Sequence, residues 1–281
     1  MIGPHLLLGP ASIDRWVDEG RDLPGGGALN MAYHWSRRGV PFGLITRVGS
    51  EDGDTVLDFM RRNDIPFLPS STVAPGHSAA IDVVIGEDRQ PHMDHFVEGV
   101  WRSFQLTAEE DVAVRNATTL HAVLVDPVAA EVHRLGDTGL LDNVRVSGDF
   151  LDLRHYSLDR FAATMQHLAL GFVGWPGDPD DPVVHGLRSI AEELGRTLVI
   201  TLGSRGVLLV VGATTRFVPV SAVQVTGTTV GCGDSFIAAF LAELHLGGTI
   251  DEALDAGRAA GAAATTWLRP LPDEAYAPTT R

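Results

Sequence analysis

Short runs of apolar residues alternate, along most of the chain, with longer segments in which apolar residues recur at helical spacing. The apolar runs have the length of buried strands and fall at residues 6–8, 42–48, 120–125, 144–147, 169–173, 197–201 and 207–211. The segments between them predict helices at residues 28–38, 55–63, 108–116, 159–167 and 182–194. Strands that alternate with helices of this length indicate βαβ units, so the pattern predicts an α/β fold around a parallel sheet.

The C-terminal region departs from this alternation. It predicts two successive helices, residues 234–245 and 250–268, and Thr249 with Glu252 has the spacing of a capping box at the start of the second. We therefore expect the α/β domain to finish with a helical pair.

A second departure lies at residues 78–85 and 93–97, which read as strands on either side of the polar turn 86–90. With residues 13–22 they predict a small antiparallel flap outside the main sheet. Such a flap is either a lid over a site or a surface hairpin without function, and the pattern fits both. The segment also holds His92, Asp94 and His95, but no partner pair at zinc spacing occurs elsewhere, which favours a solvated turn over a metal site.

The charge balance narrows the possible functions. The 281 residues include 36 acidic and 21 basic side chains, a net charge of −15, and every basic residue is Arg. Without Lys the chain cannot contain a P-loop, the strand lysine of a protein kinase or the Schiff-base lysine of a pyridoxal enzyme. The acidic balance also argues against a nucleic-acid or acidic-membrane partner.

The cysteine content, the N-terminal residues and the lack of long apolar stretches predict the cellular compartment. The single cysteine, Cys232, cannot form an internal disulfide, and the N-terminal residues lack the basic and apolar regions of a signal peptide. No stretch approaches the ~18 apolar residues of a membrane span. We expect a cytoplasmic protein.

The most informative segment is residues 226–236, in which small residues directly precede the predicted helix 234–245. Backbone N–H groups of small residues at a helix start converge into an anion site, and Asp234 would place a carboxylate beside it. This arrangement fits phosphoryl transfer, with the amides stabilising the transferred group and the carboxylate accepting a proton. Asp234 as a plain N-cap, worth about 1 kcal/mol, fits equally well on residue types alone.

Two further glycine-rich turns could contact a ligand. Gly25 and Gly26 precede a predicted helix in which Asn30 lies about one turn from the start, and a solvated Asn after an ordinary turn is the alternative. Residues 201–206 form a Thr-x-Gly-x-x-Gly turn after an apolar strand. This turn lies where open α/β sheets bind ligands, although a simple hairpin turn would read the same way.

In this order and at these separations, the three motifs resemble the ribokinase-like (phosphofructokinase-B type) carbohydrate kinase family. The resemblance implies an α/β three-layer sandwich with a mainly parallel central sheet and a small β lid. The whole chain, residues 1–281, would form one kinase domain, with the lid at about residues 12–23 and 77–98. The implied reaction is transfer of the γ-phosphate of ATP to a hydroxyl of a carbohydrate or sugar derivative.

The resemblance also implies roles for individual residues. The catalytic set is Asp234 as general base with the amides of Gly231, Cys232 and Gly233. Substrate would be bound by Asp14, Gly25, Gly26 and Asn30, and ATP by Thr201, Gly203 and Gly206. Residues 97–100 and 149–152 are similar to those of family members that phosphorylate fructosamines, so a fructosamine such as fructoselysine is the first acceptor to consider.

Two positions depart from the family pattern. Thr228 stands where the family has an Asp that helps to hold a monovalent cation, which puts a K⁺ requirement in doubt. Asp178 is the remaining stand-in for the family's Asn-x-x-Glu, so it is the candidate ligand for Mg²⁺. These changes keep open the alternative of a catalytically impaired sugar- or nucleotide-binding homologue. A nucleoside kinase is the second alternative, because related lids accept adenosine-like substrates. The expected partners are a small sugar and ATP, and the exposed edges of the lid make a homodimer plausible.

Overall fold

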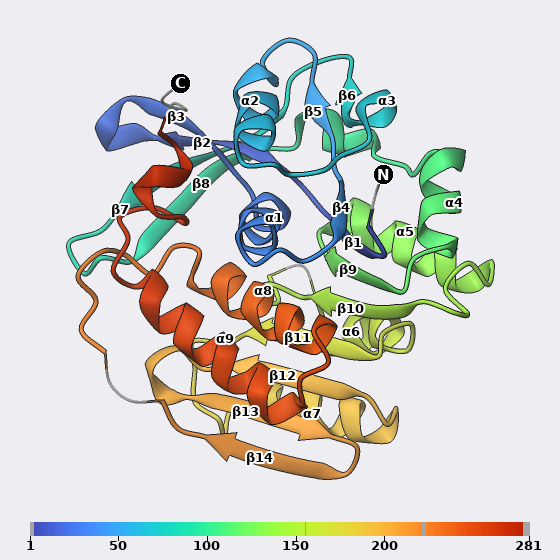
Figure 1. Ribbon diagram of the computed structural model, residues 1–281. Helices are drawn as coiled ribbons and strands as arrows, with labels where there is room; N and C mark the ends of the chain where they lie inside the picture. Colours follow the sequence, from blue (N-terminus) through green and yellow to red (C-terminus); the bar gives the residue numbers. More distant parts are fainter. Residues whose placement is uncertain (1–2, 155, 221–222, 278–281) are drawn as a thin grey trace. The chain divides into compact units, whose positions relative to one another are not determined.

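The computed structural model describes residues 3–154, 156–220 and 223–277 (Figure 1). The chain forms two compact units, Met1–Phe104 with Val223–Arg281 (the first unit) and Gln105–Ala222 (the second unit). Residues 1–2, which belong to the segment read for a signal peptide, lie outside the described ranges. Within those ranges no helix has both the length and the apolar character that crossing a bilayer requires.

The second unit contains a six-stranded run of sheet in the order β14-β13-β12-β11-β10-β9. The parallel strands are β9 (Thr119–Val123), β10 (Arg145–Asp149), β11 (Leu170–Gly174) and β12 (Thr197–Thr201). Two antiparallel strands, β13 (Val207–Val211) and β14 (Thr214–Val218), extend it. Its helices are α4 (Ala108–Arg115), α5 (Asp126–Asp137), α6 (Leu158–Met165) and α7 (Pro182–Glu193). The predicted alternation around a parallel sheet is confirmed.

Local signals account for most of these elements. Leu198, Val199 and Ile200 of β12 are all fully buried, as expected of a strand covered on both faces. Helix α4 begins with a capping box of Thr107 and Glu110. Helix α5 and strand β14 were not predicted. α5 carries a Pro in its first turn. In a sequence, a Pro marks either the start of a helix or a break in one, so it did not by itself indicate this helix.

The first unit contains a parallel pair of strands, β1 (His5–Leu8) and β4 (Phe42–Ile45), and the helices α1 (Gly27–Arg37), α2 (Asp54–Arg62), α8 (Cys232–His245) and α9 (Ile250–Ala264). The predicted strand 42–48 is divided: β4 ends at Ile45, and β5 (Val48–Gly49) pairs with β6 (Val73–Ala74). A short helix, α3 (Pro69–Thr72), precedes β6. Helix α8 lies alongside both α9 and α1 (Figure 1).

The predicted flap is a separate four-stranded sheet in the order β3-β2-β7-β8 (Figure 1). Its strands are β2 (Ser12–Trp16), β3 (Arg21–Gly25), β7 (Ala79–Ile85) and β8 (Pro91–Val97). Expecting the sheet to be antiparallel throughout was wrong, because β2 and β7 pair in parallel. The long chain path from β3 to β7 through α1 and α2 allows this pairing, which a hairpin does not.

We call this element the four-stranded sheet. Its Trp16, Leu23 and Val83 form an apolar cluster with Val230, which lies just before α8. His92 and His95 are exposed on β8, and His95 pairs with Asp82. No group of three or more potential metal ligands occurs among the described residues.

Candidate active site

Asp234 and Asn30 come together in the first unit. Asp234 lies in the first turn of α8, which begins after Gly231, and Asn30 lies in the first turn of α1, after Gly26. The Asn30 Nδ2 donates a hydrogen bond of 2.7 Å to Asp234 Oδ2. Two glycine-rich helix starts that are far apart in sequence therefore share one contact. Asp234 does not bond to the backbone as an N-cap would, because the cap position is Gly231.

Asp14 adds a second carboxylate to this cluster. It lies on β2, is 6% exposed, and accepts a 2.7 Å hydrogen bond from Ser12 Oγ. Burial raises its pKa to about 6, against the hydrogen bond from Ser12 and with a further contribution from the charge of Asp234. Burial likewise raises the pKa of Asp234 to about 6, and the hydrogen bond from Asn30 opposes that rise. Two carboxylates with such pKa values are bases suited to neutral pH.

The other end of the Asn30 amide has no partner in the part of the chain that the structure describes. Asn30 is 4% exposed, and its Oδ1 is buried without a hydrogen bond among the described residues. A buried acceptor left unpaired costs about 1–3 kcal/mol, so such an atom next to a carboxylate pair points to a ligand that carries a donor. A hydroxyl group fits this requirement.

The glycines of the site serve different purposes. A Cβ at Gly25 would collide with the Asp14 carboxylate, and one at Gly231, where φ is +74°, would meet Pro270. A Cβ at Gly26, where φ is +98°, would likewise meet the carbonyl of Pro10. Gly233 differs, since among the described residues no atom beyond its chain neighbours and its own helix backbone lies within 4 Å of the position of its Cβ. The space beside the first turn of α8 is open at Gly233, as an anion site at a helix start requires.

Cys232 contributes backbone rather than a reactive thiol. Burial first, and then the charge of Asp234, raises the thiol pKa to about 12, so the group stays protonated at neutral pH. Its amide donates to Thr229 O over 3.3 Å, a long bond that closes the turn before α8.

The segment of residues 226–229, which we call the entry segment of α8, is held from two sides. The amides of Gly227 and Thr228 donate to the carbonyls of Thr265 and Trp267, just beyond α9. Thr228 is buried, and its Oγ1 accepts a hydrogen bond from the Val230 amide. Thr228 is therefore used as a neutral turn residue.

From the other side, the turn of the four-stranded sheet contacts the entry segment. Arg89 donates to the carbonyls of Thr226 and Gly227, and Gln90 accepts from Thr229 Oγ1. Neither residue is predictable from the sequence, because no local pattern links a hairpin turn to a segment about half the chain away.

His34 was missed as well, although its spacing held a signal. It follows Asn30 by one helical turn, and its Nε2 lies 3.0 Å from Ser235 Oγ. Burial lowers its pKa to about 4, with a smaller effect of Arg38, so the imidazole is neutral. Asn30 and His34 thus contact the neighbours Asp234 and Ser235 from the same face of α1.

The predicted nucleotide turn lies in the second unit. Thr201 ends β12, Gly203 and Gly206 have positive φ values of +60° and +139°, and the Leu202 amide closes the turn on the Gly206 carbonyl at 2.8 Å. The turn connects antiparallel strands, so it is also the hairpin considered as an alternative. Because its glycines have no side chain, the backbone of the turn can approach a phosphate closely.

Asp178 lies in the loop after β11, beside this turn. Its Oδ2 is 3.6 Å from Arg205 of the turn, its side chain is exposed, and the neighbouring Trp175 amide donates to Thr201 O. Mg²⁺ in phosphoryl-transfer enzymes takes one or two carboxylates, with phosphate and water oxygens as the other ligands. A single exposed carboxylate next to a glycine turn fits that role.

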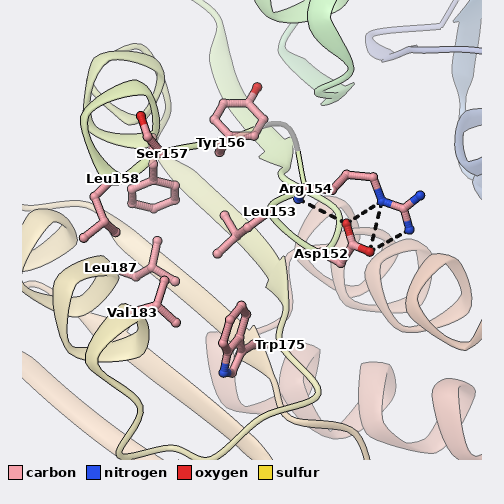
Figure 2. A pocket seen from close by; sticks show the side chains of 10 residues that line it. Asp152, Leu153, Arg154, Tyr156, Ser157, Leu158, Trp175, Val183 and Leu187 are labelled. Atoms are coloured by element: carbon pink, nitrogen blue, oxygen red, sulfur yellow. Dashed lines mark hydrogen bonds and ion pairs between the residues drawn. The ribbon is translucent and has the colours of Figure 1, made fainter.

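A pocket of about 360 Å³ lies in the second unit, just past the carboxyl ends of β10 and β11 (Figure 2). Leu153, Leu158, Leu187 and Trp175 form much of its wall. Its polar side chains are engaged with the protein: Asp152 with Arg154, Tyr156 with Leu124 O, Ser157 with the Arg160 amide, and Trp175 with Asp181. The pocket includes none of the predicted site residues.

Comparison with known proteins agrees with the motifs. Residues 169–268 match the pfkB family of carbohydrate kinases. Fructoselysine 6-kinase of Escherichia coli (strain K12) is 27% identical over 263 residues, which cover 91% of this chain and 94% of that protein.

Two solved structures share the fold at low sequence identity. Ribokinase of Arabidopsis thaliana, complexed with ribose and ATP, has a TM-score of 0.75 at 17% identity, with 98% of each chain covered. Adenosine kinase of Schistosoma mansoni has a TM-score of 0.80 at 14% identity, covering 96% of this chain and 97% of that one. The predicted three-layer α/β fold with a mainly parallel sheet is confirmed by this likeness. Together, the pfkB carbohydrate kinase match over residues 169–268, the likeness to fructoselysine 6-kinase and the ribokinase-like fold support an ATP-dependent phosphotransferase of the sugar and nucleoside kinase class.

Proposed function

We propose that this kinase phosphorylates a sugar hydroxyl that is bound at Asp234, Asn30 and Asp14. The observation that carries the proposal is the buried Asn30 amide, which fixes the Asp234 carboxylate with Nδ2 and leaves Oδ1 as an unpaired acceptor. A polyhydroxylated acceptor supplies several donors at close spacing. One hydroxyl would donate to Asp234, and neighbouring hydroxyls to Asn30 Oδ1 and Asp14.

In the proposed reaction, Asp234 accepts the proton of the attacking hydroxyl as its oxygen bonds to the γ-phosphorus and the bond to ADP breaks. Its pKa of about 6 leaves it mostly ionised at neutral pH while keeping it a useful base. The amides of Gly231, Cys232 and Gly233 at the start of α8 stabilise the charge on the transferred group. The open space beside Gly233 leaves room for that group.

A separate part of the proposal concerns ATP. Thr201, Gly203 and Gly206 would bind ATP through the bare turn after β12. Mg²⁺, with Asp178 as its protein ligand, would neutralise charge on the phosphates. Thr228 cannot supply the carboxylate that a monovalent cation prefers, so we propose that the reaction does not require K⁺.

For the acceptor, we propose a fructosamine such as fructoselysine. Support comes from the 27% identical fructoselysine 6-kinase and from the resemblance of residues 97–100 and 149–152 to fructosamine kinases. A nucleoside acceptor is the second candidate, supported only at the level of the fold by the likeness to adenosine kinase.

The test is ADP formation from Mg-ATP with matched panels of fructosamines, ketoses, aldoses and nucleosides. We expect turnover with a fructosamine above that with its parent ketose. Selective turnover of nucleosides would replace the proposed substrate. Binding of ATP and a sugar by calorimetry without turnover across the panel would indicate a catalytically impaired homologue.

We further propose that residues 1–281 act as one kinase domain in the cytoplasm, with the four-stranded sheet as its lid. Met93, Phe96 and Val97 are exposed on β8, an edge strand of this sheet, and would form the interface of a homodimer. Sedimentation of the wild type and of Phe96→Asp tests the interface. A monomeric wild type at assay concentration would exclude it.

A further inference from the structure

We propose that Arg89 is a positioning residue that links the four-stranded sheet to the anion site at the start of α8. The inference rests on the proposed kinase reaction and adds a residue to it that the motifs do not contain. Arg89 would act through the entry segment, residues 226–229, and not by touching the substrate.

The β7–β8 turn is ordered by its own hydrogen bonds. The Gly86 amide donates to Gln90 O and the Arg89 amide to Gly86 O, both at 2.9 Å. The Gln90 amide donates to Asp88 Oδ1 at 3.0 Å. Arg89 itself has φ +62°, a conformation uncommon for a residue with a Cβ. These hydrogen bonds fix the backbone of the turn and therefore the positions from which the Arg89 and Gln90 side chains extend.

Both side chains contact the entry segment. Arg89 Nη1 donates to Thr226 O at 2.7 Å and to Gly227 O at 3.1 Å. Thr229 Oγ1 donates to Gln90 Oε1 at 2.7 Å. Hydrogen bonds from a charged guanidinium are stronger than those between neutral groups, so Arg89 is the main restraint on this side.

The entry segment is thereby held along both backbone edges. Its amides at Gly227 and Thr228 bond to the carbonyls of Thr265 and Trp267 at 2.9 and 2.8 Å, while its carbonyls bond to Arg89. The first restraint comes from the helical part of the unit and the second from the four-stranded sheet. The position of the sheet and the shape of the entry segment are therefore coupled through Arg89.

A shift of the entry segment reaches the anion site directly. Thr228 Oγ1 accepts from the Val230 amide, and Thr229 O accepts from the Cys232 amide, the first residue of α8. The guanidinium also brings a positive charge to the segment that leads into the anion site, which favours negative charge there. Losing Arg89 would misplace the amides that receive the phosphoryl group, while the acceptor contacts at Asp14 and Asn30 would remain.

The effect of Arg89→Ala should therefore fall on the transfer step. We expect kcat to drop roughly 10- to 100-fold, the effect of a displacement of about 1 Å, with the sugar KM nearly unchanged. Arg89→Lys, which keeps a charged donor, should recover part of the rate, and added guanidinium should partly rescue Arg89→Ala. Arg15→Ala is the matched control, because Arg15 is an exposed arginine on β2 of the same sheet and pairs with Asp82.

Hydrogen–deuterium exchange gives a readout that needs no activity. We expect peptides spanning residues 226–232 to exchange faster in Arg89→Ala than in wild type or Arg15→Ala, with unchanged circular dichroism. Unchanged exchange together with an unchanged kcat would overturn the proposal, and so would a rise in the sugar KM alone, which would make Arg89 a substrate contact. A wild type that turns over no acceptor would refute the proposed function, whereas the exchange experiment would still test Arg89.

Discussion

Asn30 donates its side-chain amide to Oδ2 of Asp234 over 2.7 Å, although 204 positions separate the two residues. One turn farther along α1, His34 lies 3.0 Å from the hydroxyl of Ser235, the next residue of α8. Two residues on one face of α1 thus hold two consecutive residues at the start of α8. This pairing orients the Asp234 carboxylate and explains why both glycine-rich helix starts are needed for one site.

Asp234→Asn should remove the general base while keeping the shape of the site. We expect turnover to fall roughly 10²- to 10⁴-fold, the range for loss of general-base catalysis, because an amide cannot accept the proton of the attacking hydroxyl. ATP binding measured by calorimetry should persist. Asp54→Asn is the control, since Asp54 is an exposed carboxylate in the first turn of α2, which also follows a Gly cap. A variant of Asp234 with a near-normal rate would remove it as the base.

Asn30→Ala should weaken both acceptor binding and catalysis. The variant loses the bond to Asp234 and the free acceptor Oδ1, and one or two buried hydrogen bonds at 1–3 kcal/mol each predict a loss in kcat/KM of roughly 10- to 100-fold or more. Steady-state kinetics with varied sugar and saturating ATP measures this loss, with Asn116→Ala at the end of α4 as the control. An unchanged kcat/KM for the sugar would show that Oδ1 does not face the acceptor.

Substitutions at Gly233 and Gly231 distinguish a glycine that leaves space for a bound anion from one that is required by the backbone conformation and packing. Gly233→Ala enters open space within a helix, so it should raise stability by about 0.5–1 kcal/mol while lowering turnover, because the methyl group occupies the space for the phosphoryl group. Gly231→Ala should cost about 1–3 kcal/mol, since φ is +74° and the Cβ would meet Pro270. Urea unfolding and kinetics of both variants provide the measurement. Full activity of Gly233→Ala would argue against phosphate at this position.

The two carboxylates should make stability depend on pH in a defined direction. The pKa values of Asp14 and Asp234 rise from 3.8 to about 6 in the folded chain, so the folded state holds more protons than the unfolded state between pH 4 and 6. Their contribution to the free energy of unfolding is therefore present below pH 4 and is lost as pH rises through 6.

Asp14→Asn removes one of these charges and its repulsion with Asp234. We expect it to stabilise the protein at pH 8 by on the order of 1–3 kcal/mol, and by much less at pH 4.5. Urea unfolding at the two pH values measures the difference, and Asp58→Asn, an exposed carboxylate paired with Arg61, serves as the control. Greater stabilisation at pH 4.5 than at pH 8 would contradict the assigned environment of Asp14.

The rate should not respond to monovalent cations. Thr228 is neutral, buried and bonded to the Val230 amide, so it offers no carboxylate to K⁺. Assays in potassium chloride and in tetramethylammonium chloride at equal ionic strength should give the same kcat. Activation by K⁺ but not by Na⁺ would mean that other groups of the site bind the cation.

Several features were predictable from the sequence because their signals are local. The alternation of apolar runs with helical spacing indicated the parallel sheet, and small residues before an apolar stripe indicated the start of α8. Where local signals were ambiguous, the predictions failed. The Pro in the first turn of α5 concealed that helix, and the residues after β4 read as a continuation of the same strand.

Interactions between distant segments were decided by the tertiary structure alone. The sequence placed Asp14, Asn30 and Asp234 in one site only through resemblance, whereas the folded chain buries Asp14 beside Asp234 and bonds Asn30 to it. The parallel pairing of β2 with β7, the Arg89 contacts and the raised pKa values have the same origin. Desolvation and hydrogen bonding depend on which side chains the fold brings together, and no periodicity or motif in one segment encodes its partner in another.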